Sequence, residues 1–289
     1  MGGTMTHRIS HAGLLVPSIA RAATVWSGVF GLQPWALGVW HVVEEGVRTL
    51  MLPIGDSAGV ELLESVDPDT PFRRALDADR GLYHMSLRVA DLDEAVRRLR
   101  DAESWVQVRP AGELLRLRRG WVDPASACGA HIELIDEREI LALGLPASGP
   151  PRPTGVFERL SHVGQLVADL DAALRFYRDA LGLEPESEQP LPWTEEGARA
   201  LRFDVGDGPG LEVVEPSHEC GPLWPHFQRH GPGLAYLGME VADLDCALET
   251  LSSRDLWLQH RPRGEALPRS VWVHARSTHG ALLRLTEGA

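Results

Sequence analysis

The sequence predicts an α+β protein with two tandem domains, built from copies of one strand–turn–helix unit. Residues 81–100, GLYHMSLRVADLDEAVRRLR, contain the clearest copy of this unit. The strand carries His84 and Arg88 on one face, because its residues alternate with a period of two. After the turn VADLD the apolar residues recur at helical spacing, and Asp91 or Asp93 is placed to cap that helix.

The unit occurs four times, and the second half of the chain repeats the first. The turn VADLD returns at 167–171 and 241–245, and a weaker copy, VPSIA, occupies 16–20. Longer segments recur in the same order: ISHAGLLV as LSHVGQLV, EEGVRTLML as EEGARALRF, GVELLES as GLEVVEP, and HIELIDE as ALLRLTE. A stretch rich in proline and glycine lies between the halves, as in a linker. We therefore predict a first domain at 1–147, a linker at 148–157 and a second domain at 158–289.

The first domain has room for a series of short strands and three helices. Period-2 patterns and turn residues predict strands at 9–16, 46–53, 59–64, 105–108, 114–122 and 130–135, besides the strand that contains His84. A helix should run through Ala23 and Val29 and end at Gly31, and a loop with a short helix should occupy 67–78.

Composition excludes several classes of partner. The 289 residues carry a formal net charge of −13, which argues against binding to nucleic acids or to anionic membranes. No run approaches the roughly 20 apolar residues of a membrane span, and the first ten residues do not have the composition of a signal peptide. We expect a cytoplasmic protein. Cys128, Cys220 and Cys246 have no CxxC spacing, which disfavours a disulfide framework or a cysteine zinc site.

The repeat places four polar residues of the first half on predicted strands: His11, Glu61, His84 and Glu133. A carboxylate on a buried strand is costly unless it is paired, protonated or bound to a metal. Imidazole and carboxylate groups together suit one divalent ion of the series Co, Ni, Mn, Zn or Fe. Alternatively, each residue faces solvent on an open sheet.

The second half favours the metal interpretation by contrast. Its residues at the same four repeat positions are His162, Glu212, Tyr236 and Arg284. The guanidinium of Arg284 would repel a cation. One functional site and one degenerate site explain this pattern better than two unrelated polar faces.

Further polar residues are expected near this site. Ser86 and Arg88 follow His84 on its face, and Arg88 either holds a substrate carboxylate or phosphate or forms a salt bridge at the rim. Trp40, in a connector, either contacts substrate or packs against a long loop. His131 should share the face of Glu133, as a hydrogen-bonding partner, a proton shuttle or a core histidine.

The first half resembles the vicinal oxygen chelate superfamily, which contains glyoxalases, bleomycin-resistance proteins and extradiol dioxygenases. Within that superfamily it is most similar to the methylmalonyl-CoA epimerase branch. The segments HAGLLVPSIARAATVWSGVFGL, GVRTLMLPIGDSAGVELLE, PDTPFRRALDADRGLYHMSLRVADLDEAVRRL and WVDPASACGAHIELIDE carry the resemblance. It implies four βαβββ modules, paired into two domains with cup-shaped mixed sheets. It also implies a divalent metal ion on His11, Glu61, His84 and Glu133, with the second domain keeping only the module frame.

One position departs from the epimerase pattern. The additional catalytic glutamate of the epimerases corresponds here to Thr49, which cannot act as a general base near pH 7. Thr49 is instead expected to contact the substrate. Glu133 or Glu61 is then the expected base, with His131 as an auxiliary group.

The resemblance implies a metal-dependent epimerase, isomerase or lyase. A small acyl or carbonyl substrate would chelate the metal through neighbouring oxygens, and a proton would move through a metal-stabilised enolate. One alternative is an Fe(II)-dependent extradiol-type dioxygenase, whose site needs two histidines and one carboxylate and leaves more positions open than four protein ligands do. Another is a protein of the same fold that binds a small molecule or drug without turnover. The second half would act as an internal partner, giving a monomer with a pseudo-dimeric core, or else the chain forms a homodimer.

Overall fold

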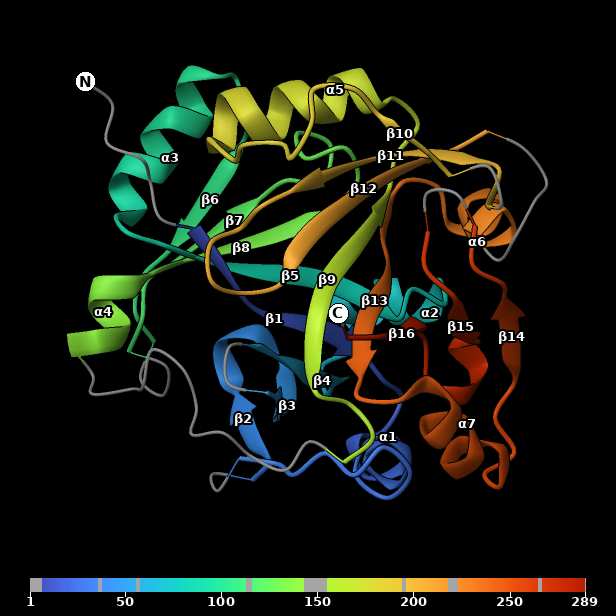
Figure 1. Cartoon of the computed structure of the whole chain (residues 1–289). Coiled ribbons are helices and arrows are strands. Elements are labelled where there is room, and N and C mark those ends of the chain that lie inside the picture. Colours follow the sequence, from blue (N-terminus) through green and yellow to red (C-terminus); the bar gives the residue numbers. More distant parts are fainter. Residues whose placement is uncertain are drawn as a thin grey trace. The chain divides into compact units, whose positions relative to one another are not determined.

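The computed structural model describes residues 7–35, 38–55, 58–112, 116–142, 155–193, 196–217, 223–264 and 267–288. Its strands form two mixed, curled sheets of eight strands each, one sheet from each half of the chain (Figure 1). The strand orders are β2-β3-β4-β1-β5-β8-β7-β6 and β10-β11-β12-β9-β13-β16-β15-β14, so the two sheets have the same topology. The predicted α+β fold of four βαβββ modules is confirmed.

The first half contains eight strands and several short helices within its described residues. The strands are β1 (His7–Leu15), β2 (Trp40–Val42), β3 (Val47–Ile54), β4 (Ala58–Ser65), β5 (Leu82–Val89), β6 (Val106–Arg109), β7 (Arg119–Val122) and β8 (His131–Asp136). The helices are α1 (Ile19–Trp26), η1 (Val43–Glu45), α2 (Pro71–Asp77), α3 (Leu92–Asp101) and α4 (Glu137–Ala142).

The second half repeats this order. Its strands are β9 (Arg159–Leu166), β10 (Leu191–Trp193), β11 (Ala198–Phe203), β12 (Gly210–Pro216), β13 (Gly233–Val241), β14 (Leu258–Arg261), β15 (Ser270–Val273) and β16 (Leu282–Glu287). Its helices are α5 (Leu170–Leu174), which continues as the π-helix η2 (Arg175–Leu181), then α6 (Leu223–His230), α7 (Leu244–Ser252) and η4 (Ala275–Ser277).

The repeated turn starts each module helix by the same capping interaction. Asp91, Asp169 and Asp243 each accept a hydrogen bond from the backbone N–H three residues further on, and Ser18 does so for α1. Such a cap satisfies one of the N–H groups that a helix leaves without an intrahelical partner, and contributes about 1 kcal/mol. In α3 the apolar stripe is buried, as its spacing predicts: Leu92, Ala95, Val96 and Leu99. The VADLD signal therefore has a local physical cause.

Three elements differ from the sequence prediction. The strand expected at 114–122 begins only at Arg119, because Arg118 uses its backbone and side chain to bind the Glu139 carboxylate. Helix α1 ends at Trp26 and continues as a turn to the predicted stop, Gly31, which has φ +79°. The residues after Glu137, expected to lead directly into the linker, first form α4. The predicted linker at 148–157 lies mostly outside the described residues.

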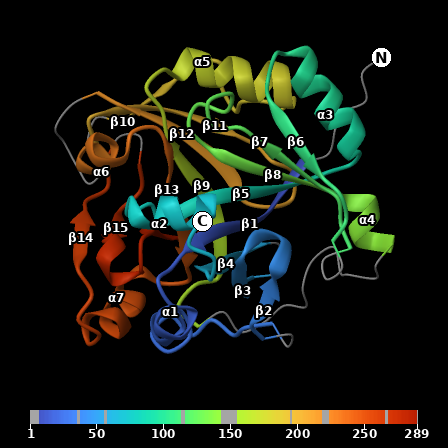
Figure 2. The same cartoon turned by 180° about the vertical axis from the view of Figure 1, so that it is seen from behind.

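Close contacts divide the chain into two compact units that combine modules from both halves. Unit I comprises Met1–Ser10, His84–Ala147 and Val163–Ala235, and unit II comprises His11–Tyr83, Ser148–His162 and Tyr236–Ala289. In unit I, helix α3 contacts η2 (Figure 2). At that contact Arg98 donates a hydrogen bond to the carbonyl of Asp179. In unit II, the indole Nε1 of Trp26 donates to the carbonyl of Thr278 at 3.2 Å.

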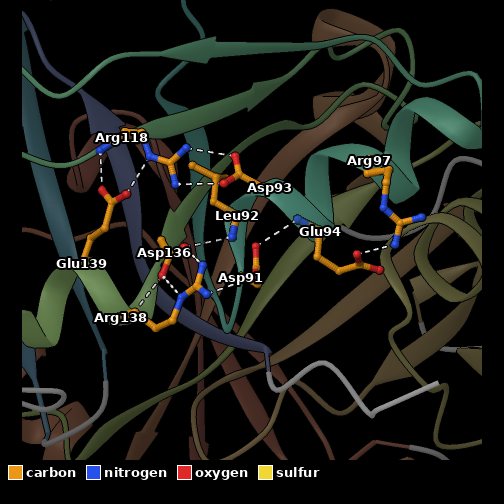
Figure 3. Close-up of polar contacts among 9 residues, drawn as sticks. All are labelled: Asp91, Leu92, Asp93, Glu94, Arg97, Arg118, Asp136, Arg138 and Glu139. Carbon is orange, nitrogen blue, oxygen red and sulfur yellow. Dashed lines mark hydrogen bonds and ion pairs between the residues drawn. The ribbon is translucent and has the colours of Figure 1, made fainter. Parts of the chain in front are cut away.

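An ion-pair network in unit I fixes the end of β8 against the start of α3 (Figure 3). The Asp136 carboxylate accepts hydrogen bonds from the Leu92 N–H at 3.0 Å and from Arg138 at 2.7 Å. Arg118 bridges Asp93 and Glu139. Burial disfavours the ionised form of Asp136, but the hydrogen bonds from Arg138 and from backbone N–H groups outweigh it and lower the pKa of Asp136 to about 2. The network therefore anchors the strand that carries Glu133.

Among the described residues, no helix is long and apolar enough to cross a membrane. Cys128 and Cys246 are free thiols, while Cys220 lies outside the described residues.

Candidate metal centre

Strands β1 and β4 present His11 and Glu61 on one face of the first sheet. The antiparallel register pairs Trp40 with Thr49 and Met51 with Glu61, and directly paired residues point to the same side of a sheet. His11 pairs with Gly59 on the parallel strand β4, two positions before Glu61. The period of two therefore gathers these polar side chains on one face of an otherwise apolar sheet.

The Glu61 carboxylate is held from two sides. Its Oε2 lies 3.4 Å from His11 Nε2, and its Oε1 accepts a 2.5 Å hydrogen bond from the Thr49 hydroxyl. Thr49 is fully buried, so this contact fixes the orientation of the carboxylate. Thr49 thus acts on Glu61, a role that its sequence position did not reveal.

His84, on β5, completes a group of three potential ligands with His11 and Glu61. One ligand atom from each of the three residues lies within 4.8 Å of the other two, and no other such group occurs within the part of the chain that the structure describes. The ring of His84 is 2% exposed and meets Trp121 edge-on, with 5.3 Å between centroids. Two imidazoles and one carboxylate at this spacing fit a divalent transition metal.

Glu133 lies outside this group of three. On β8 it pairs with Ser86 of β5 and with Trp121 of β7, so these three residues share a face of the sheet. Its Oε1 lies 3.8 Å from Nη1 of Arg119, and both residues are buried. The guanidinium compensates the charge of a carboxylate that would otherwise be costly to bury.

The remaining predicted residues also lie on these faces. His131 is half-buried and pairs with His84 in the register of β5 and β8. The Arg88 Nε lies 3.4 Å from the hydroxyl of Ser10. Burial, and next the charge of Arg8, lower the pKa of Arg88 to about 10. Arg88 therefore stays protonated at neutral pH.

Three buried polar atoms on these faces have no hydrogen-bonding partner among the described residues: Trp40 Nε1, Ser86 Oγ and Trp121 Nε1. Buried donors are almost always satisfied in folded proteins, and a bound ligand is one way to satisfy them. The sequence indicated Trp40 and Ser86 but not Trp121 or Arg119. Both missed residues belong to β7, whose start the sequence prediction had placed at residue 114 instead of Arg119. An arginine and a tryptophan within a predicted strand were the signal that could have identified them.

The second half keeps the frame of the site and changes its chemistry. Its carboxylate, Glu212, forms an ion pair with Arg202 at 2.7 Å. Tyr236 takes the position of His84 and packs edge-on against Trp272 and His162. Arg284 lies 5.9 Å from the Tyr236 ring centroid. Tyr236 and Arg284 stand where the first half has an imidazole and a carboxylate, and Glu212 is already paired with a guanidinium, so this donor set does not fit a metal ion.

Comparison with known proteins identifies relatives of both halves. A family model described as the glyoxalase/bleomycin resistance protein/dioxygenase superfamily matches residues 10–112 and 161–272. The mitochondrial methylmalonyl-CoA epimerase of Mus musculus is 29% identical over 139 residues, which cover 47% of this chain, in its N-terminal half, and 76% of the relative.

Two solved structures share the fold over nearly the whole chain. A variant of 4-hydroxymandelate synthase from Streptomyces coelicolor has a TM-score of 0.71 at 17% identity, covering 98% of this chain and 92% of that one. A halotolerant catechol dioxygenase has a TM-score of 0.64 at 16% identity, covering 99% and 88%. At these identities the likeness establishes the fold alone.

Proposed function

The chain belongs to the glyoxalase/bleomycin resistance protein/dioxygenase superfamily, and from this premise we propose that its first half is a divalent-metal-dependent epimerase, isomerase or lyase. The observation that carries the proposal is the group of His11, Glu61 and His84 within 4.8 Å. These residues would hold the ion, with Glu133 as a fourth ligand. The substrate would be a small acyl or carbonyl compound with two neighbouring oxygens, such as an acyl thioester or an α-hydroxycarbonyl.

A bound divalent ion would supply Lewis acidity to the substrate oxygens, and so make the adjacent carbon–hydrogen bond more acidic. The protein must then move the proton. Glu133 is the better base, because the Thr49 hydroxyl and His11 already hold Glu61 in place. His131, which pairs with His84 in the register of β5 and β8 and is half-buried, would relay a proton toward solvent.

Substrate orientation is assigned to the donors that lack a protein partner. Trp40 Nε1, Ser86 Oγ and Trp121 Nε1 can each donate a hydrogen bond to a substrate oxygen. Arg88, protonated at neutral pH and half-buried, suits a carboxylate or phosphate on the substrate. The similarity of the first half to methylmalonyl-CoA epimerase supports an acyl thioester with a second carbonyl group as the first substrate to test.

A second candidate function is an Fe(II)-dependent dioxygenase of the extradiol type. One observation favours it: the clustered set is two histidines and one carboxylate, because Glu133 lies outside the group of three. Such a set leaves three positions of an octahedral ion for substrate and oxygen. The second half is proposed as an internal partner in either case, which predicts a monomer by light scattering.

The test is elemental analysis of the wild-type chain, of His84→Ala and of Tyr236→Ala, purified without chelator. The proposal expects about one divalent ion per chain in the wild type and in Tyr236→Ala, and none in His84→Ala. Incubation with methylmalonyl-CoA in D2O should then incorporate deuterium at the carbon between the carbonyls, whereas oxygen consumption with a catechol would favour the dioxygenase. A wild-type chain that takes up no metal refutes both functions.

A further inference from the structure

The turn that leads into β8 adopts an unfavourable backbone conformation. Residues 123–130 connect β7 to β8, and Gly129 N–H bonds to the Pro124 carbonyl at 2.7 Å. Cys128 has φ +50° and Gly129 has φ +97°. A non-glycine residue in this region costs of order 1–3 kcal/mol and persists only when its surroundings impose it. The surroundings of this turn therefore determine where β8, and with it Glu133, begins.

Side chains of the second half hold this turn. The Gln165 amide Nε2, on β9, donates to the carbonyls of Ala127 and Cys128, both at 3.0 Å. The Tyr177 hydroxyl, on η2, donates in turn to Gln165 Oε1. Gln165, Tyr177 and Ala127 are fully buried, so the Ala127 carbonyl could not find water in place of the amide.

The backbone of the second half closes on the same turn. A Cβ atom at Gly129 would lie 2.5 Å from the carbonyl carbon and oxygen of Pro232, so only glycine fits there. All of these residues belong to unit I, together with the whole of β8. The strand is thus held at its beginning by the second half and at its end by Asp136.

We propose that Gln165 and Tyr177 are positioning residues for Glu133, so that the half without a metal-binding set holds a ligand strand of the half that has one. This inference rests on the proposed function for the role of Glu133. Only four residues separate Cys128 from Glu133, and the chain is in strand β8 from His131 onward. A shift of the turn is therefore transmitted to the carboxylate, rather than absorbed by a flexible loop.

The pseudo-symmetry of the chain supplies a matched control. The repeat aligns Leu14 with Gln165 and Trp26 with Tyr177. Trp26 Nε1 donates to Thr278, in the turn of the second half that carries His279 at φ +62° and leads to β16. Strand β16 carries Arg284, the counterpart of Glu133 in the second half. Weakening the turn before β16 is therefore a similar change to the protein, but it does not act on the strand that carries Glu133.

The experiment titrates metal-free full-length protein with Co2+, followed by isothermal calorimetry, for the wild type, Gln165→Leu, Tyr177→Phe and Trp26→Phe. Gln165→Leu installs the residue of the other half, and Tyr177→Phe removes one oxygen atom should the first variant not fold. We expect the Co2+ dissociation constant to rise about tenfold in Gln165→Leu and about threefold in Tyr177→Phe, because residues that support metal ligands contribute to metal affinity. Trp26→Phe should bind as the wild type does.

Hydrogen exchange of the amides in 130–134 gives a readout that does not depend on metal. Exchange there should accelerate in Gln165→Leu and stay unchanged in Trp26→Phe. Equal Co2+ affinity in all four proteins, or equal losses in Gln165→Leu and Trp26→Phe, overturns the positioning role. If the wild type binds no Co2+, the proposed function fails, and the exchange comparison alone then decides whether Gln165 positions β8.

Discussion

The two halves share a frame but differ in the charges placed on it. His84 meets Trp121 edge-on at 5.3 Å and 76°, and Tyr236 meets Trp272 at 5.1 Å and 74°. The register of the last strand is also the same, since Ser86 pairs with Glu133 as Gly238 pairs with Arg284. The same apolar residues and strand pairings therefore accommodate an acidic residue, Glu133, in one half and a basic residue, Arg284, in the other.

The halves differ most clearly in the surroundings of Glu61 on β4 and of its counterpart Glu212 on β12. Glu61 receives a neutral hydroxyl donor, Thr49, whereas Ala200 takes the place of Thr49 in the second half. Met51, paired with Glu61, is replaced by Arg202, which neutralises Glu212. A carboxylate that faces a hydroxyl is available to a cation, while one that faces a guanidinium already has one. Two residues of the neighbouring strand therefore give the same repeat position a different partner in each half.

The histidine of the first strand differs as well. A Cβ at Gly238 would lie 1.9 Å from Cε1 of His162, so this ring occupies space that only a glycine leaves open. The corresponding residue in the first half is Ser86, which carries the Cβ that Gly238 lacks. His162 instead contacts the hydroxyl of Ser161 through Nδ1 at 2.9 Å. The two histidines are therefore placed differently on equivalent strands.

The largest expected difference between the halves concerns His84 and its counterpart Tyr236. His84→Ala should abolish metal binding, a loss of at least 100-fold in affinity, because one of three clustered ligands disappears. Tyr236→Ala makes the equivalent change in the second half and should leave metal content intact. Equal metal content in the two variants, measured by elemental analysis, would place the ion elsewhere.

Replacing Arg202 tests the ion pair of the second half. Arg202→Met copies the first half and removes the cation from the buried Glu212, which should lower the free energy of unfolding by about 3–5 kcal/mol. Chemical denaturation measures this loss. Arg199→Ala, which removes a pair that is half exposed, should cost about 1 kcal/mol or less. Comparable effects would mean that burial does not distinguish the two pairs.

Thr49 offers a smaller and more specific change. Thr49→Ala copies the second half, frees the orientation of Glu61 and should weaken metal affinity by about 10- to 100-fold. Thr49→Ser keeps the hydroxyl and should retain most of the affinity, which calorimetric titration can check. If serine and alanine behave alike, the hydrogen bond has no role in the site.

The last pair of changes concerns the ends of β8 and β16. Asp136 ends β8 and is buried, while Glu287 ends β16 and is exposed. Since the pKa of Asp136 is lowered to about 2, its stabilisation is complete above pH 4 and is lost as the pH falls toward 2. Asp136→Asn should lower the free energy of unfolding at pH 7 by about 1–3 kcal/mol and flatten its pH dependence between pH 4 and 2. Glu287→Gln should do neither in the same acid titration.

Sequence reasoning succeeded where a local cause sets the structure. The aspartates of the VADLD turns cap helices because the N–H three residues on is always within reach of their side chains. The alternation that put His84 and Ser86 on one face needs only the period of a strand. The start of β7 was misplaced because a contact with α4, more than 20 residues away, ends the preceding loop.

The amino-acid sequence was enough to predict four modules and their duplication. It also predicted a metal site on His11, Glu61, His84 and Glu133, of which the structure groups the first three. Three contacts became visible only in the folded structure: the hydrogen bond from Thr49 to Glu61, the ion pair of Arg119 with Glu133, and the hydrogen bonds from Gln165 to the turn before β8. Capping and periodicity act over a few residues, so the chain encodes them in short patterns. These other contacts depend on strand register and on segments up to 38 residues apart, whose proximity exists only after the sheets have formed.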